Sequence, residues 1–274
     1  MLDTLIQIEN VTVEYAAGRN TRREVLNNVS LDIAAGEFIS IVGETGCGKS
    51  TLLRLILGQE KPTRGRVQVD GRERGQPDRQ CGYVPQKYSL FPDKTVLDNV
   101  TFGPEVTRFG AWAAFGILHR GELRRFREEA LRYLRHTGLD ESDARKYPHQ
   151  LSGGMQQRVA IAQALIMKPP ILLMDEAFSA LDPATRQGMQ RLIKKLWRES
   201  GTTIVFVTHN TREAVCLGTR VIALAKNEGP RRGSAIALDL PVPDLDFDST
   251  DREVAELVRE VEYASVRETS VVYN

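Results

Sequence analysis

A glycine-rich loop that could hold phosphate runs over residues 43–51, between an apolar run at 38–42 and a helical pattern at 52–57. Glycines let successive backbone N–H groups curl around an anion, and the start of a helix adds partial positive charge. Lys49 supplies a full charge, and the Ser50 hydroxyl can bind a magnesium ion held by the same phosphates. The order of strand, loop and helix therefore predicts a nucleoside-triphosphate site. Its loop residues are Gly43, Glu44, Thr45, Gly46, Cys47, Gly48, Lys49, Ser50 and Thr51.

Polar residues that could do chemistry follow other apolar runs. Asp175 and Glu176 end a run typical of a buried parallel strand, and His209 follows a second such run. Gln86 ends a short strand and enters a loop rich in proline and polar residues. Taken singly, each has an ordinary interpretation, because Glu176 could cap a helix, His209 could be structural and Gln86 could be solvated.

A second possible anion site precedes a long predicted helix. Ser152, Gly153 and Gly154 can offer a hydroxyl and backbone N–H groups to a phosphate. About 100 residues separate them from the first loop, which is too far for the two to be one loop.

The pattern of elements predicts an α/β fold. Alternating apolar residues at 5–15 and 25–33 indicate antiparallel strands, and a helical block interrupts the α/β order later in the chain. From Asp239 the periodicity is lost, and a helical tail is expected over 251–267. The other expected elements are strands at 66–70, 81–86, 171–174, 202–207 and 221–224 and helices at 95–100, 122–135, 155–166, 183–199 and 211–217.

Composition limits the class of protein. The 274 residues, 41% hydrophobic and 27% charged, fit one large domain, or one domain with a subdomain and a tail. Because 37 Lys and Arg nearly balance 36 Asp and Glu, we expect no nucleic-acid partner. The three scattered cysteines suit a reducing compartment. No apolar stretch approaches the ~20 residues of a membrane span, so another protein would have to dock the chain at a membrane.

With these motifs in this order, the sequence resembles the ATP-binding-cassette (ABC) ATPases, whose signature motif is matched by residues 151–156. The resemblance covers roughly the first 240 residues. It implies a P-loop core with a mostly parallel sheet and flanking helices, an antiparallel β subdomain and an inserted α-helical subdomain. The expected domains are 1–240, with the helical subdomain at about 87–165, and a tail at 241–274.

The resemblance also implies roles for single residues. Tyr15 would stack on the adenine of ATP, although a strand-end tyrosine is also ordinary. Lys49 would bind the β- and γ-phosphates. Three further roles concern Mg²⁺ and water: Ser50 would bind the ion, Asp175 would hold it through water, and Gln86 would touch both the ion and the attacking water.

The family pattern makes Glu176 the general base and His209 the switch residue that contacts the γ-phosphate. Residues 179–182, including Asp182, match a loop that crosses a dimer interface. One ATP would then lie between the P-loop of one subunit and the Ser152 to Gly154 motif of another. The sequence departs from the pattern at Ala177, often proline, and at Asn210, often aspartate, where a loop contact would at most be weakened.

The layout, one cassette with a compact helical block, favours a transporter ATPase docked on separate integral-membrane permease subunits. The motifs look most like bacterial importers of the nitrate, sulfonate and taurine type, with a weaker likeness to relatives for urea- or guanidine-type compounds. The implied partners are the permease, a second cassette, expected as a homodimer, and a solute-binding protein. The implied location is the cytoplasmic face of the inner membrane, as a peripheral subunit. A lipid or lipoprotein exporter ATPase and a soluble non-transport ABC ATPase remain alternatives.

An apolar, aromatic insertion at residues 109–118 is less expected. We hypothesise that it contacts the permease or the lipid headgroups, because exposed apolar patches mark interfaces. The alternative is that it packs internally.

Overall fold

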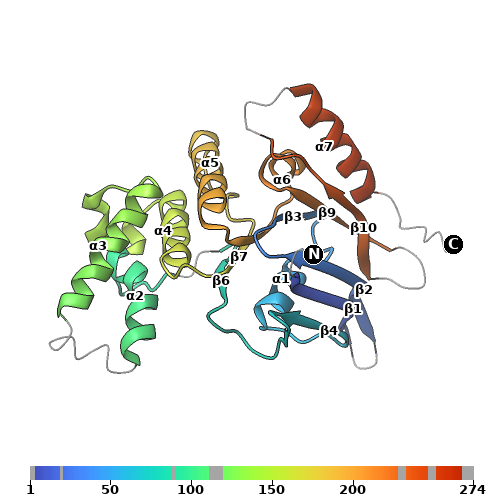
Figure 1. Ribbon diagram of the computed structural model, residues 1–274, viewed down its shortest axis with the longest axis horizontal. Coiled ribbons are helices and arrows are strands. Elements are labelled where there is room, and N and C mark those ends of the chain that lie inside the picture. The colour runs from blue at the N-terminus through green and yellow to red at the C-terminus, as the bar shows by residue number, and fades with distance from the viewer. Residues whose placement is uncertain are drawn as a thin grey trace.

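The computed structural model describes residues 4–18, 21–87, 90–110, 120–227, 233–245 and 251–266. Within those ranges one sheet of ten strands runs through the molecule, in the order β5-β4-β1-β2-β10-β9-β3-β8-β7-β6 (Figure 1). The strands are β1 Thr4–Ala16, β2 Arg22–Ala34, β3 Phe38–Gly43, β4 Arg64–Val69, β5 Arg72–Glu73, β6 Cys81–Val84, β7 Ile171–Asp175, β8 Thr203–Val207, β9 Arg220–Lys226 and β10 Ser234–Pro241.

The half of the sheet that holds the predicted chemistry is parallel. β6, β7, β8, β3 and β9 pair in parallel, so their carboxyl ends meet at one edge. Both faces of this half are covered, which is why these strands read as continuous apolar runs. Ile39 and Ile41 of β3 pack on the face that carries α1 (Lys49–Leu57), whereas Phe38 and Val42 point to the opposite face.

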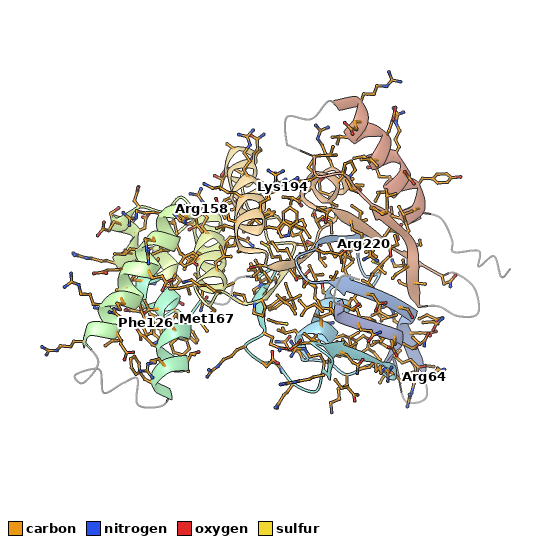
Figure 2. The ribbon with its side chains drawn as sticks, viewed as in Figure 1. Arg64, Phe126, Arg158, Met167, Lys194 and Arg220 are labelled. Atoms are coloured by element: carbon orange, nitrogen blue, oxygen red, sulfur yellow. The ribbon has the colours of Figure 1, made fainter. Side chains whose placement is uncertain are left out.

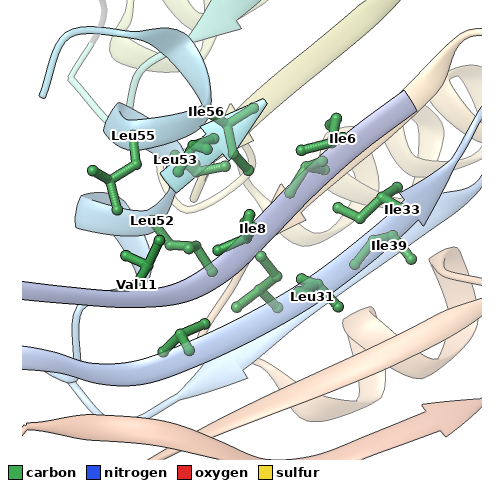
Figure 3. Packing of buried hydrophobic residues seen from close by; sticks show 14 of the residues in the cluster. Ile6, Ile8, Val11, Leu31, Ile33, Ile39, Leu52, Leu53, Leu55 and Ile56 are labelled. Atoms are coloured by element: carbon green, nitrogen blue, oxygen red, sulfur yellow. The ribbon is translucent and has the colours of Figure 1, made fainter. Parts of the chain in front are cut away.

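The other half is antiparallel, as the alternation at 5–15 and 25–33 predicts. β1 pairs with both β2 and β4, and the three curl around α1. Figure 3 shows Ile6 and Ile8 of β1 and Leu31 of β2 packed toward Leu52 and the rest of α1. The P-loop helix is therefore held between two kinds of sheet.

Helices form a block at one end of the molecule (Figure 1). It contains α2 (Val96–Phe109), α3 (Arg120–His136), α4 (Gly153–Leu165) and two 3₁₀ turns, Glu141–Arg145 and Pro148–Gln150, around a core of its own. Thr95 caps α2 and Ser152 caps α4, each accepting a backbone N–H three residues on. The predicted interruption of the α/β pattern is confirmed.

The apolar insertion at 109–118 falls mostly outside the described residues. Of it only Phe109 and Gly110 are described, and the Phe109 ring lies 6.3 Å, centroid to centroid, from Phe126 on α3. The hypothesis that the insertion contacts a permease stays a prediction.

The face of the sheet opposite α1 is covered by α5 (Pro183–Ser200), α6 (Thr211–Leu217) and α7 (Asp251–Val266). The tail helix expected at 251–267 is present, and Val254 and Val261 of α7 are buried against α6 and β9. The sequence misses β10, which continues through Asp239 to Pro241. Only one of its residues pairs with β2, so its register comes from β9, and a proline is tolerated at its end.

In the ranges that the structure describes, no helix combines the length and apolar character of a membrane span.

Candidate functional site

The P-loop requires glycine at two positions for steric reasons. Gly43 has φ 151°, and a Cβ there would lie 2.4 Å from the Leu224 carbonyl oxygen. Gly48 has φ 97°, and a Cβ there would lie 2.6 Å from the Leu26 side chain. The loop backbone can therefore follow this path only without side chains at those positions.

Lys49 lies inside the curve of the loop and is only 6% exposed. Its Nζ donates to the carbonyl oxygens of Gly43, at 2.7 Å, and Glu44, at 3.0 Å. An ammonium group whose present partners are loop carbonyls can exchange them for phosphate oxygens, as the predicted role needs.

Ser50 and Asp175 come together as the sequence predicts for a metal pair. The Ser50 hydroxyl donates to the Asp175 carboxylate, which is 5% exposed at the end of β7. Burial raises the pKa of Asp175, and the nearby Glu176 raises it further, whereas the Ser50 hydrogen bond and Lys49 lower it. A hydroxyl and a carboxylate beside a phosphate loop are the oxygen ligands that Mg²⁺ takes, since this ion keeps most of its other ligands as water and phosphate. The residues fit the ion.

Glu176, Gln86 and His209 also meet at one point. The Gln86 Nε2 donates to the Glu176 Oε2 at 2.6 Å, and the His209 Nδ1 lies 3.5 Å from the same oxygen. Glu176 has φ 47°, an uncommon conformation for a residue other than glycine, and its backbone N–H donates to the Val207 carbonyl of β8. This turn away from β7 directs the carboxylate to the end of the strands.

Tyr15, at the end of β1, is 37% exposed. Its hydroxyl lies 3.3 Å from the Thr51 Oγ1, and Arg54 donates to it at 3.4 Å. The tyrosine is thus anchored to the P-loop helix by its hydroxyl, with part of the side chain left accessible.

The second anion motif lies away from the P-loop within this chain. Figure 1 shows α4, which begins at Gly153, and α1 on different sides of β6 and β7. Ser152 is exposed, and a Cβ on Gly154 would lie 3.4 Å from Leu181, just before Asp182. Asp182 caps α5, accepting from the Thr185 N–H at 3.0 Å. The chain therefore brings Ser152, Gly153, Gly154 and Asp182 near one another but not to Lys49.

Asn210, a departure from the family pattern, performs a capping role. Its side chain accepts from the Glu213 N–H at 3.0 Å at the start of α6. Asparagine is as good an N-cap as aspartate, so the substitution keeps this contact.

Two residues, Tyr83 and Arg158, make contacts that escape sequence reasoning. The Tyr83 hydroxyl donates to Asp175, and burial, together with that carboxylate, raises the pKa of Tyr83 to about 12. Arg158 of α4 donates to the Gly138 carbonyl and to the Thr185 hydroxyl of α5, each at 2.8 Å (Figure 2). Tyr83 lies three residues before Gln86, which is the only local hint; the Arg158 contacts join segments distant in sequence.

A P-loop at the end of the parallel strand β3, with two carboxylates at the end of β7, one strand further along the sheet, defines the chain as a P-loop nucleotide-binding protein. A family model for ABC transporters matches residues 26–179. The taurine import ATP-binding protein TauB of Rhizobium johnstonii is 41% identical over 89% of this chain and 85% of that protein. The aliphatic sulfonates import ATP-binding protein SsuB 1 of Burkholderia lata is 43% identical over 85% of this chain and 64% of that protein.

Solved structures agree. A dimeric ATP-binding cassette in a post-hydrolysis state, bound to ADP and Pi, has a TM-score of 0.74 at 36% identity, covering 88% of this chain and all of that one. The chain belongs to the ABC transporter family. It is an ATP-binding cassette, and the proteins of this family hydrolyse ATP to power transport.

Proposed function

We propose that this chain is the ATP-hydrolysing subunit of an importer for a small solute of the nitrate, sulfonate or taurine type. The names of the taurine and sulfonate relatives support that class of solute. The subunit would work at the membrane, bound to integral-membrane permease subunits. The observation that carries the catalytic part is the meeting of Glu176, Gln86 and His209 at the end of the strands that hold the P-loop and Asp175.

In the proposed reaction, water attacks the γ-phosphorus of ATP, the bond to the β-phosphate oxygen breaks, and ADP and inorganic phosphate form. Lys49 would bind the β- and γ-phosphates, exchanging its contacts with loop carbonyls for them. Glu176 would accept the proton of the water, since its carboxylate lies at the site but outside the Ser50 and Asp175 pair.

Gln86 and His209 would orient this base and contact the γ-phosphate. Both already contact the same oxygen of Glu176, so their side chains have the reach that these roles need. Tyr15 would stack on the adenine, because its side chain is exposed next to the P-loop helix.

Bound Mg²⁺ would neutralise the phosphate charge during this reaction. Ser50 and Asp175 would hold it, with Gln86 as a third oxygen donor at the open side.

The active unit would be a dimer. Helix α4, which begins at Gly153, lies away from α1, which begins at Lys49, so Ser152, Gly153 and Gly154 would serve the ATP of a second copy. The dimeric assembly of the structurally similar cassette supports this arrangement. ATP buried between two such surfaces favours the closed dimer, and hydrolysis removes that preference.

The test uses Glu176→Gln in the native host. The variant should still dimerise when ATP is added, while its kcat falls by roughly a hundredfold to ten-thousandfold. The membrane protein that co-purifies identifies the permease and, through its solute-binding partner, the solute. Full hydrolysis by the variant would refute the base, and the absence of a co-purifying membrane protein would refute the transport role. Glu199→Ala, at the exposed far end of α5, serves as the control carboxylate.

A further inference from the structure

A single residue of α6, Glu213, holds the turn that carries His209 through hydrogen bonds. The Thr208 hydroxyl donates to the Glu213 Oε2 at 2.5 Å and accepts from the Asn210 N–H at 3.1 Å. The Asn210 side chain in turn accepts from the Glu213 N–H at 3.0 Å. Both neighbours of His209 are therefore tied to Glu213.

The His209 side chain itself is 62% exposed, so packing does little to fix its direction. Its position depends on the backbone of residues 208–210. Whatever fixes that backbone also fixes where the imidazole can reach.

Glu213 has a second partner on a different element. Its Oε1 accepts from the Nε2 of Gln190 on α5 at 2.6 Å, and Gln190 is only 9% exposed. Hydrogen bonds to an ionised carboxylate are shorter and roughly twice as strong as neutral ones. An acidic residue in the first turn of a helix is favourable by itself, but that effect does not account for two short bonds from two elements.

The same helix α5 holds the loop at residues 179–182. Arg186 donates to the Phe178 carbonyl at 3.2 Å and to the Leu181 carbonyl at 3.1 Å. One small cleft is lined both by Ser179 and Arg186 and by Thr208, His209 and Glu213. Helix α5 thus touches both the 179–182 loop and, through Gln190 and Glu213, the His209 turn.

We propose that Glu213 is a positioning residue for His209, and that the chain Thr208, Glu213, Gln190 links the γ-phosphate contact to helix α5 and the 179–182 loop. This inference rests on the proposed role of His209. When His209 contacts the phosphate, a shift of the 208–210 turn displaces the Glu213 side chain. The hydrogen bond to Gln190 then transmits this displacement to α5. Glu213 would act through His209 and not on the substrate itself.

The experiment compares Glu213→Ala and Glu213→Gln in the full chain, each with His209 intact and with His209→Ala. Steady-state ATPase, ADP affinity and thermal unfolding are measured. Glu213→Ala should lower kcat by roughly tenfold to a hundredfold, because a small misplacement of a catalytic group costs that much, while ADP affinity stays within about twofold. Glu213→Gln should retain most activity, because its amide can accept from Thr208 and a turned Gln190 amide can accept from it.

The effect of Glu213→Ala in the His209→Ala variant shows whether Glu213 positions His209 or supports the structure in general. In the His209→Ala chain, Glu213→Ala should produce no further loss, since the residue it positions is gone. A full additional loss there, or wild-type kcat for Glu213→Ala with His209 present, would overturn the inference. If His209→Ala alone is fully active, the proposed role of His209 fails instead, so the two failures are distinguishable.

Thr208→Val covers the case in which Glu213→Ala does not fold. It removes the hydroxyl that donates to Glu213 and accepts from the Asn210 N–H, and it should show the same dependence on His209. Glu199→Ala, on α5 with a 60% exposed side chain, is the control and should match the wild type in every measurement.

Discussion

The amide of Gln86 and the carboxylate of Glu176 lie 90 residues apart in the sequence, yet the Gln86 Nε2 donates to the Glu176 Oε2 at 2.6 Å. Gln86 belongs to the segment that leads from β6 into the helical block, and Glu176 follows β7. A movement of the helical block relative to the sheet would act directly on the proposed base.

This contact predicts a change in pH dependence for Gln86→Glu. Two carboxylates at this distance repel, so one holds its proton to a higher pH and the pKa of the pair rises. The acidic limb of the ATPase pH profile should therefore move to higher pH, with lower activity near neutrality that recovers as the pH rises. Gln68→Glu on β4 is the control and should leave the profile unchanged; an unshifted profile for Gln86→Glu would contradict the proximity of the two groups during turnover.

Substitutions of Tyr15 test whether its ring stacks on the adenine. Tyr15→Ala should weaken ADP binding by roughly 5- to 100-fold, the range expected for loss of one base–aromatic stack. Tyr15→Phe keeps the ring and should bind nearly as the wild type does. Calorimetry with tripolyphosphate, which has no base, provides the control, because its affinity should be the same for all three proteins. Equal losses of affinity for tripolyphosphate and ADP would show that the ring supports the P-loop and does not stack on the adenine.

Gln157 predicts a gain in stability. It is fully buried on α4, on the same face as Gly154 and Ile161, and within the described part of the chain neither polar atom of its amide has a hydrogen-bond partner. A buried unpaired polar group costs about 1–3 kcal/mol. Gln157→Met keeps the volume and should raise the free energy of unfolding of the nucleotide-free protein by about 1 kcal/mol.

The control for this prediction is Gln156→Met on the same helix. The Gln156 amide donates to the Leu151 carbonyl, so its loss should not stabilise the protein. Urea denaturation of both variants gives the comparison. Destabilisation by Gln157→Met would mean that the buried amide is satisfied in solution.

Asp244 predicts a pH-dependent loss of stability. It pairs with Lys194, which is 3% exposed and also donates to the Cys216 and Leu245 carbonyls, and with Arg198. Burial alone would raise the pKa of Asp244, but the hydrogen bonds from Lys194 and Arg198 outweigh it and lower the pKa. At pH 7, Asp244→Asn should cost about 1–2 kcal/mol, less than a fully buried pair because the Asp244 side chain is 41% exposed.

The sign follows from the lowered pKa. The ionised carboxylate contributes its full stability above the unfolded-state value, and that contribution is lost as the pH falls through the folded-state pKa. The difference in urea stability between Asp244→Asn and the wild type should therefore shrink toward zero in acid. A difference independent of pH would assign the effect to packing instead of charge.

Most of the fold is readable in the sequence because local chemistry specifies it. Ser152 before α4 and Asp182 before α5 are residue types that favour the N-cap position, and each accepts a backbone N–H three residues on. The carboxyl ends of β3 and β7 meet at one edge, so parallel pairing alone brings Asp175 to the P-loop.

What the sequence does not reveal depends on contacts between distant elements. β10 is an exception, because Ile236, Leu238 and Leu240 alternate along it and the sequence does carry this local signal, while its register comes from β9. The link from Thr208 through Glu213 to Gln190 joins three elements by side chains of common types. Such contacts are fixed by how α5 and α6 pack, which no short spacing encodes.

The contact of Lys49 with the carbonyls of its own loop has a consequence for nucleotide exchange. Because the ammonium group already has two acceptors when no phosphate is bound, the loop keeps its shape and little ordering is required when ATP arrives. On departure of the product, the lysine can return to Gly43 and Glu44 instead of remaining a bare buried charge. The loop carbonyls thereby compete with phosphate for Lys49. This competition lowers the affinity for nucleotide and speeds the release of ADP, as repeated turnover requires.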